Sequence, residues 1–150
     1  MNLTLTWKEN NSKMNQFYVG VKIVEAWPEM QGDKPGYGVK YEDGYVSWSP
    51  KEVFEKAYLH IGEDSSKANP GMVDSFLGDD VETRTLEDGK TTMVMAKMLT
   101  GFTQYETSSC VDPANYDMVI GMQIAFDRIK NTTWKCLGFV VQWGRFGLKQ

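Results

Sequence analysis

The 150-residue sequence contains little of what most enzymes and metalloproteins use, since it has one histidine and two cysteines. A Ser-His-Asp or Cys-His site would have to use His60, which lies beside an acidic stretch without a second ligand at metal-binding spacing. Without a secretory signal, Cys110 and Cys136 are expected to be reduced and buried rather than joined in a disulfide. We therefore expect no catalytic nucleophile, no metal ion and no cofactor.

Charge and hydropathy exclude two further classes. The formal net charge is −4, whereas a protein that binds nucleic-acid polymers needs a broad basic field. No run reaches the roughly 18 apolar residues of a membrane helix, and no glycine-rich phosphate loop of the Walker or dinucleotide type occurs. The chain does have 13% aromatic residues, which can stack on flat ligands or fill interfaces. These features favour a cytosolic binding protein with neither a membrane nor a nucleic-acid polymer as partner.

The residue pattern predicts an α+β fold in a single domain over residues 16–150, preceded by an N-terminal arm over 1–15. Strands are expected over 16–27, on both sides of a turn at 42–44, and as a three-stranded meander within 81–109. Residues 28–36 read as a loop, and residues 62–80 as a long linker with a short helix near 71–78. A capped helix over 50–61 is expected to bury a stripe made of Val53, Phe54, Ala57, Tyr58 and Ile61.

The C-terminal helical part is expected to start at Pro113, capped by Asp112, and to bend at 131–133. One face holds Met118, Val119, Met122, Ala125, Phe126 and Ile129, and should pack on the protein's own sheet. A second apolar strip, made of Tyr116, Ile120 and Ile124, lies beside it. We expect this strip to pack on another chain; the alternative is that the linker over 62–80 covers it.

Two blocks of the sequence carry a resemblance to phage proteins. "FYVGVKIVEAWPE…GYGVKYEDGYVSWSPKEVFEKAY", from Phe17 to Tyr58, resembles a segment found in small phage and prophage proteins. "LTGFTQYETSSCVDPANYDMVIGMQIAFDRIKNTTWKCLGFVVQ", from Leu99 to Gln142, resembles the C-terminal half of the phage gene-product-forty-nine-like family. Together, in this order, they resemble the first family of Thoeris anti-defence proteins. Those proteins are phage sponges that bind cyclic ADP-ribose isomers made by bacterial TIR-domain defence proteins.

The resemblance implies a homo-oligomer, either a dimer or a hexamer built from dimers, with ligand pockets near the dimer interface in the host bacterial cytoplasm. The resemblance implies that the ligand is not chemically changed. It also implies that some members have a second site, which binds cyclic di- or trinucleotides. The family pocket stacks adenine on an aromatic residue beside an asparagine, which map onto Tyr105 and Asn115. The other expected ligand-binding residues are Phe102, Arg84, Arg128 and Lys130, with Lys135 as a further cation.

Each of these residues also has a structural interpretation without a ligand. Tyr105 can be a solvent-edge strand residue, Asn115 an ordinary residue of the first helical turn, and Arg128 a solvated arginine on a helix face. For Phe102 the structural interpretation, a core strand residue, is the preferred one. The chain has only three arginines, fewer than the family's phosphate contacts imply. Two alternatives to a sponge remain: a phage structural or assembly protein, and an enzyme that degrades a nucleotide signal.

Overall fold

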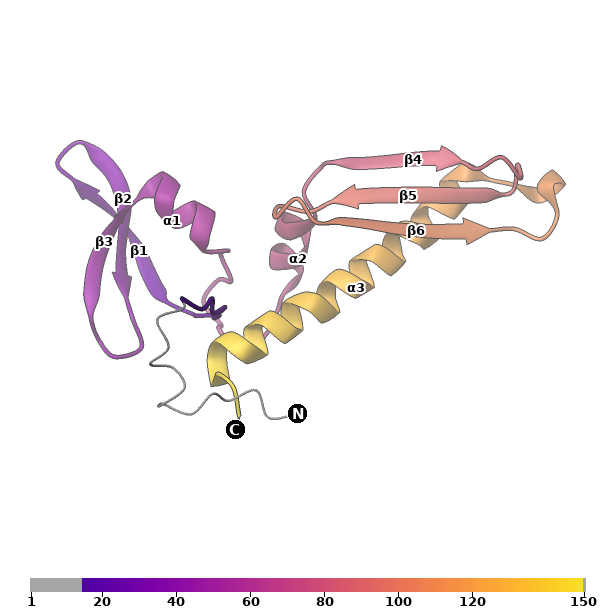
Figure 1. The fold of residues 1–150 in the computed structure, drawn as a ribbon. Helices are drawn as coiled ribbons and strands as arrows, with labels where there is room; N and C mark the ends of the chain where they lie inside the picture. The colour runs from indigo at the N-terminus through magenta and orange to yellow at the C-terminus, as the bar shows by residue number, and fades with distance from the viewer. Residues whose placement is uncertain (1–14, 150) are drawn as a thin grey trace.

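The computed structural model describes residues 15–149, so the predicted N-terminal arm lies outside the described residues except for Asn15 (Figure 1). The described chain contains two three-stranded antiparallel sheets, each in sequential strand order. Sheet A consists of β1 (Glu25–Gln31), β2 (Lys34–Lys40) and β3 (Val46–Pro50). Sheet B consists of β4 (Val81–Thr85), β5 (Thr91–Lys97) and β6 (Thr103–Ser109). Together with the helices, these sheets confirm the predicted α+β class.

The helices divide between the two sheets. The short α1 (Lys51–Ala57) packs on β2 and β3, while the long α3 (Met118–Phe146) runs along one face of sheet B. Helix α2 (Pro70–Leu77) packs on α3, and the 3-10 turn η2 (Pro113–Asn115) connects β6 to α3. No helix within residues 15–149 has the length and apolar character needed to cross a membrane.

Sheet A differs from the sequence prediction at its start. The expected strand over 16–27 is wrong in its bounds, because β1 spans 25–31 and residues 15–24 belong to no ladder. The expected loop over 28–36 is also wrong: β1 and β2 pair through it, and the turn is at Gly32 with φ +65. Pro28 is tolerated because β1 is an edge strand, where a missing N–H leaves no ladder bond unmade. The predicted turn at 42–44 is confirmed, since Asp43 Oδ1 accepts a hydrogen bond from the Tyr45 N–H at 2.9 Å.

Helix α1 is shorter and less buried than expected. It ends at Ala57 rather than at residue 61, no side chain caps its first turn, and none of its residues is buried. Its contact with the sheet is aromatic instead: the ring of Phe54 stacks on Tyr37 at 4.3 Å and on Tyr58 at 4.8 Å between centroids. The expected apolar stripe is wrong for Val53 and Ala57, which are exposed, whereas Phe54, Tyr58 and Ile61 are half-buried.

Helix α3 is continuous, and the bend expected at 131–133 is wrong. Thr133 is fully buried and keeps its hydroxyl satisfied, because Oγ1 donates to the Ile129 carbonyl at 2.9 Å and accepts from Gln104 Nε2 at 2.9 Å. A polar residue is therefore compatible with the buried side of the helix. That side repeats every four residues and consists of Gly121, Ala125, Ile129, Thr133, Leu137 and Val141.

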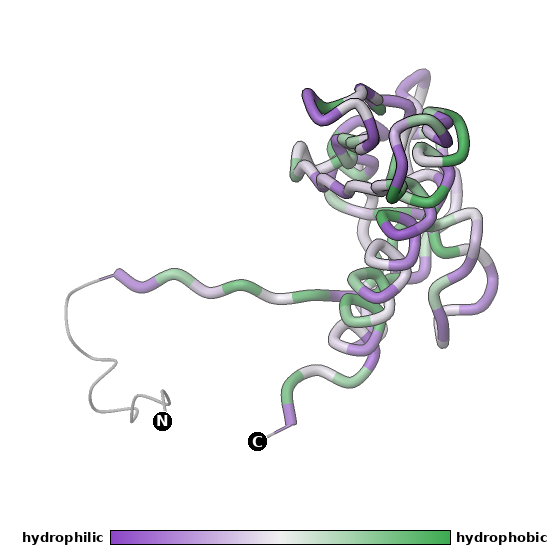
Figure 2. Tube along the Cα trace, turned by 90° about the vertical axis from the view of Figure 1, so that its right-hand side faces the viewer, coloured by the Kyte–Doolittle hydropathy of each residue, from purple (hydrophilic) through white to green (hydrophobic). Residues whose placement is uncertain are grey.

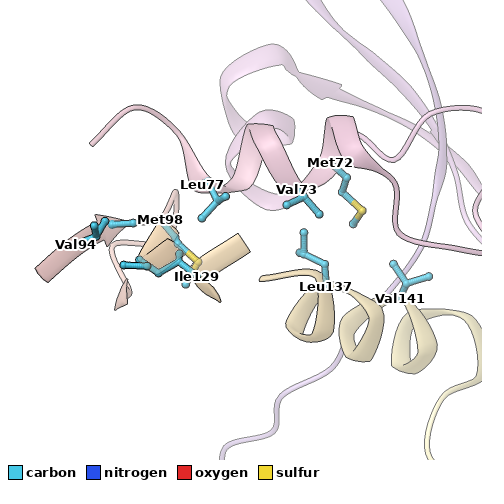
Figure 3. Close-up of a cluster of buried hydrophobic side chains, with 10 residues drawn as sticks. Met72, Val73, Leu77, Val94, Met98, Ile129, Leu137 and Val141 are labelled. Atoms are coloured by element: carbon cyan, nitrogen blue, oxygen red, sulfur yellow. The ribbon is translucent and has the colours of Figure 1, made fainter. Parts of the chain in front are cut away.

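The apolar core lies between sheet B, α2 and α3 (Figure 3). Figure 3 shows Met72 and Val73 of α2 pointing toward Leu137 and Val141 of α3. The face predicted for α3 is correct for Ala125 and Ile129, which are fully buried. The core also contains Leu77, Val94, Ala96 and Met98, with Met122 and Phe126 half-buried beside it. By contrast, Met118 and Val119 are exposed, so the prediction for these two residues is wrong.

The segment before β1 touches the far end of α3. Val21 and Ile23 are half-buried and lie against Gly144, where an added Cβ would be 2.9 Å from Ile23 Cγ1. Phe17, Tyr18 and Val19 are exposed, and Figure 2 shows this segment extending away from the rest of the chain.

Candidate functional site

A small pocket lies where sheet B, η2 and the first turns of α3 meet. Its volume is about 110 Å³. Three chain segments supply its walls: the β4–β5 turn with the start of β5, the end of β6, and the stretch from η2 into α3. The lining residues are Lys90, Thr92, Ser108, Ser109, Cys110, Asn115, Tyr116, Asp117, Ile120, Gly121 and Ile124. The lining thus combines hydroxyl, amide and charged groups with two isoleucine side chains.

Tyr116 fixes the back of the pocket to sheet B. Its hydroxyl lies 2.7 Å from Thr85 Oγ1 and 2.9 Å from Thr92 Oγ1, so it joins the inner faces of β4 and β5. Thr92 is fully buried, and a Cβ on Gly121 would lie only 2.3 Å from its Oγ1. The start of α3 can rest this closely on β5 because residue 121 has no side chain.

Two aspartates shape the turn that carries Asn115. Asp112 Oδ1 accepts from the Ala114 N–H at 2.9 Å, and Asp117 Oδ1 accepts from the N–H groups of Val119 and Ile120 at 2.9 and 3.2 Å. Helix α3 therefore begins at Met118, and the predicted start at Pro113 is wrong: Asn115 belongs to η2. Since the Asp117 carboxylate already occupies the helix N-terminus, these N–H groups are not available to an anionic ligand.

Lys90 supplies the pocket's positive charge and sits on a well-held turn. Asp88 accepts hydrogen bonds from the Lys90 and Thr91 N–H groups, each at 3.0 Å, and from the Thr91 hydroxyl at 2.5 Å. The bond from the Thr91 hydroxyl, followed by that from the Lys90 N–H, lowers the pKa of the Asp88 carboxyl below its ordinary value. The Lys90 carbonyl also accepts from the Cys110 N–H at 3.0 Å, which joins this turn to the end of β6.

Asn115 is the expected ligand residue that lines the pocket. It is exposed, and its backbone N–H donates to the Asp112 carbonyl at 3.0 Å. Within residues 15–149 its side-chain amide has no hydrogen-bond partner, so the amide is free to meet a ligand.

The neighbouring Ile120 and Ile124 are exposed, and no residue of the 62–80 linker lines this pocket. The alternative that the linker covers their apolar strip is therefore wrong.

Tyr105 and Arg84 lie on the other face of sheet B. Residues that pair across an antiparallel ladder share a face, and Tyr105 pairs with Met95 while Arg84 pairs with Met93. Because Val94 of the same strand is fully buried in the core, Met93 and Met95 must face away from α3. In one chain, Tyr105 and Asn115 therefore do not share a pocket.

The remaining expected residues are spread over four places. Arg128 Nη1 donates to the Thr107 carbonyl of the edge strand β6 at 2.6 Å. Lys130 Nζ lies 3.1 Å from Asp74 Oδ1 of α2, on the opposite flank of α3, and Lys135 is exposed further along the helix. Phe102 is exposed in the β5–β6 turn, so its interpretation as a core strand residue is wrong.

The sequence interpretation did not include Lys90, Ser108, Ser109 or Thr92 among the site residues. A local signal was available for Lys90, because it follows the Asp88-Gly89 turn that the sequence predicts. The hydroxyls gave no such signal, because serines and threonines are ordinary residues in strands.

The cysteines and the histidine occupy accessible positions. Cys136 is exposed and Cys110 half-buried, so the expectation that both are buried is wrong. His60 is exposed after α1. Within residues 15–149, no group of three or more histidine, cysteine or acidic side chains is placed to hold a metal ion.

One protein-family model matches this chain. The model described as the phage protein (N4 Gp49/phage Sf6 gene 66) family matches residues 52–143, which is more than half of the sequence. The chain belongs to this family of phage proteins. The matched part of this phage protein contains the pocket, sheet B and most of α3, whereas β1, β2 and β3 lie outside it. Neither the curated proteins nor the solved structures give a match.

Proposed function

We propose that this phage protein is a sponge: it binds cyclic ADP-ribose isomers in the host cytoplasm without cleaving them and so inhibits Thoeris defence. The pocket at the start of α3 carries the proposal. It combines the free amide of Asn115, the cation of Lys90 and the hydroxyls of β6 beside an exposed apolar strip. These groups suit a ligand with a flat base, hydroxyl-bearing sugars and phosphates. The sequence resemblance to the Thoeris anti-defence family supports the same ligand class.

The pocket of one chain is too small for such a ligand. Sites for small molecules usually enclose roughly 300–1,000 Å³, and this pocket has about 110 Å³. Its open side is bordered by Ile120 and Ile124, which are exposed. We propose that a second copy packs on this strip, encloses the ligand and supplies groups that one chain keeps apart, such as Tyr105.

The interaction energies are sufficient if the ligand is enclosed. Stacking a base on an aromatic ring contributes roughly 1–3 kcal/mol, and each charge-assisted hydrogen bond to phosphate adds about 1.5–3 kcal/mol. Association costs at least about 4 kcal/mol in lost freedom of motion. Nanomolar binding, about −12 kcal/mol, therefore needs several such contacts at once, which a half-open pocket in one chain does not offer.

Arg84, Arg128 and Lys130 keep a place in the proposal only as residues that a second copy brings to the ligand. None of the three lines the pocket of its own chain. Lys90 is the cation beside Asn115, and we propose it as the first phosphate contact. Cyclic di- or trinucleotides remain candidates for a second site.

A phage structural or assembly protein is the second candidate. The exposed apolar side chains at both ends of α3, such as Ile120 and Phe139, favour it, because contiguous exposed apolar surface marks protein contacts. Such a protein would use these surfaces for other phage chains and would not retain a nucleotide.

The experiment that tests the proposal is capture and release. The purified protein is incubated with a cyclic ADP-ribose isomer, separated from free ligand and heated, and the released nucleotide is identified by mass spectrometry. Recovery of the intact isomer supports the sponge, whereas a product of altered mass indicates an enzyme. Retention of no nucleotide contradicts the proposal and favours the assembly protein. The Asn115→Ala variant is the matched control, because this exposed side chain makes no contact that the fold needs.

A further inference from the structure

The segment before β1 carries three consecutive, highly exposed apolar side chains. Phe17, Tyr18 and Val19 are 99%, 81% and 79% exposed. They are extended and pair with no strand of residues 15–149. Figure 2 shows the segment leading away from the rest of the chain. Large apolar side chains grouped in this way mark an interaction site.

The same segment is anchored to α3 by its second half. Val21 and Ile23 are half-buried against Gly144, whose Cβ position lies 3.3 Å from Val21 Cγ1 and 2.9 Å from Ile23 Cγ1. Alternate residues of an extended chain point to the same side. Phe17 and Val19 therefore continue the side on which Val21 and Ile23 contact the helix. On this apolar side, Val21 and Ile23 contact the helix of their own chain, whereas Phe17 and Val19 remain exposed.

Helix α3 offers the matching surface. Phe139 and Val140 are 66% and 39% exposed. Val140 lies one turn before Gly144 on the same side of the helix, so it extends the surface that already holds Val21 and Ile23. The ring of Phe139 packs edge-on against Trp143, with centroids 6.2 Å apart, which limits the positions open to it.

We propose that the segment Phe17–Val19, here called the arm and distinct from the N-terminal arm predicted over 1–15, binds the Phe139–Val140 surface of a second copy of this chain. The second copy's arm binds the first in the same way, because each copy carries both the arm and the surface. The contact of Val21 and Ile23 with Gly144 supports a second copy as the partner, since it pairs the same side of this segment with the same side of α3. This exchange of arms does not depend on the proposed function. The subunit interface proposed there, at Ile120 and Ile124, lies at the opposite end of α3.

The area involved reaches the lower end of what a stable interface buries. On the side that continues Val21 and Ile23, Phe17 and Val19 present roughly 250–350 Å² per arm. Two arms, each buried against an equal area of the other copy, remove roughly 1,000–1,400 Å² from water, and stable protein interfaces bury about 1,200–2,000 Å².

Cross-linking between differently labelled copies tests the exchange. Val19→Cys and Val140→Cys are made separately in a Cys110→Ser/Cys136→Ser background, mixed, and treated with a short bismaleimide. We expect a covalent dimer in the mixture, at several times its yield in either variant alone. Lys22→Cys, on the opposite side of the same segment, is the matched control and should give little product with Val140→Cys. Absence of the dimer in the mixture overturns the proposal. So does a double variant, Val19→Cys/Val140→Cys, that links only within one chain.

A second measurement does not depend on cross-linker reach. Phe17→Ser/Val19→Ser is compared with Lys22→Ser by light scattering over a range of concentrations, with circular dichroism to confirm that both are folded. Removing the arm's anchors should raise the dissociation constant of the assembly at least about tenfold, while Lys22→Ser leaves it unchanged. An unchanged constant in the arm variant overturns the exchange.

Discussion

Gly121→Ala perturbs the closest contact between α3 and sheet B. Alanine favours a helix over glycine by about 1 kcal/mol, so the change alone would be stabilising. The added Cβ, however, would lie 2.3 Å from Thr92 Oγ1 and 2.8 Å from Thr92 Cβ, in a place that is fully buried. Overpacking of this kind costs about 1–3 kcal/mol, and displacing Thr92 also breaks its bond to the Tyr116 hydroxyl, worth about 1 kcal/mol. We expect a net loss of about 1–3 kcal/mol in the free energy of unfolding.

The matched control is Gly138→Ala in the same helix. Nothing lies within 4 Å of the Cβ position at Gly138, so its helix preference should stabilise the protein by about 0.5–1 kcal/mol. Urea unfolding followed by tryptophan fluorescence measures both variants. In a Thr92→Ala background, the cost of Gly121→Ala should fall, since the nearest clashing atom is gone. If Gly121→Ala is as stable as Gly138→Ala, the close packing of α3 on β5 is refuted.

Three further predictions concern assembly, binding and pH. Ile120→Asp should leave a folded but smaller species by light scattering, and an unchanged mass would contradict an interface at this strip. Asn115→Ala and Tyr105→Ala should each cost about 1–3 kcal/mol of affinity for a cyclic ADP-ribose isomer by titration calorimetry; wild-type affinity in both would place the pocket elsewhere. Because the pKa of Asp88 is lowered in the folded protein, its contribution is present above its ordinary pKa and is lost as pH falls through the folded value. Asp88→Asn should therefore weaken the dependence of the unfolding midpoint on pH below about 4; an equally steep dependence would show that other groups dominate.

Local signals in the sequence predicted the turns and the second sheet. The Asp-Gly pairs at 43–44 and 88–89 lie in turns between strands, because a glycine with positive φ follows an aspartate whose side chain accepts nearby N–H groups. The short helix expected near 71–78 is α2, and Asn69 caps it by accepting from the Met72 N–H. These features depend on a few neighbouring residues, and for that reason one sequence is enough to predict them.

Features that depend on distant partners were not predictable. The segment over 16–24 has strand-like composition but makes no ladder, because its contact is with the end of α3 rather than with a strand. Thr133 suggested a bend because its partner Gln104 is far away in the sequence. Similarly, Tyr105 and Asn115 are close along the chain, yet the alternation of β6 sends Tyr105 to the outer face while η2 keeps Asn115 at the pocket.

The four-residue repeat on the buried side of α3 has a consequence for the geometry of any assembly. An ideal helix turns about 100° per residue, so a stripe of every fourth residue advances roughly 40° at each step. From Gly121 to Val141 the buried stripe therefore winds about half a turn around the helix axis. The exposed surface winds with it, and Ile120 and Val140 point in nearly opposite directions. No single flat partner can cover both of these ends. If both proposed interfaces form, helix α3 directs one neighbour to each side of the molecule.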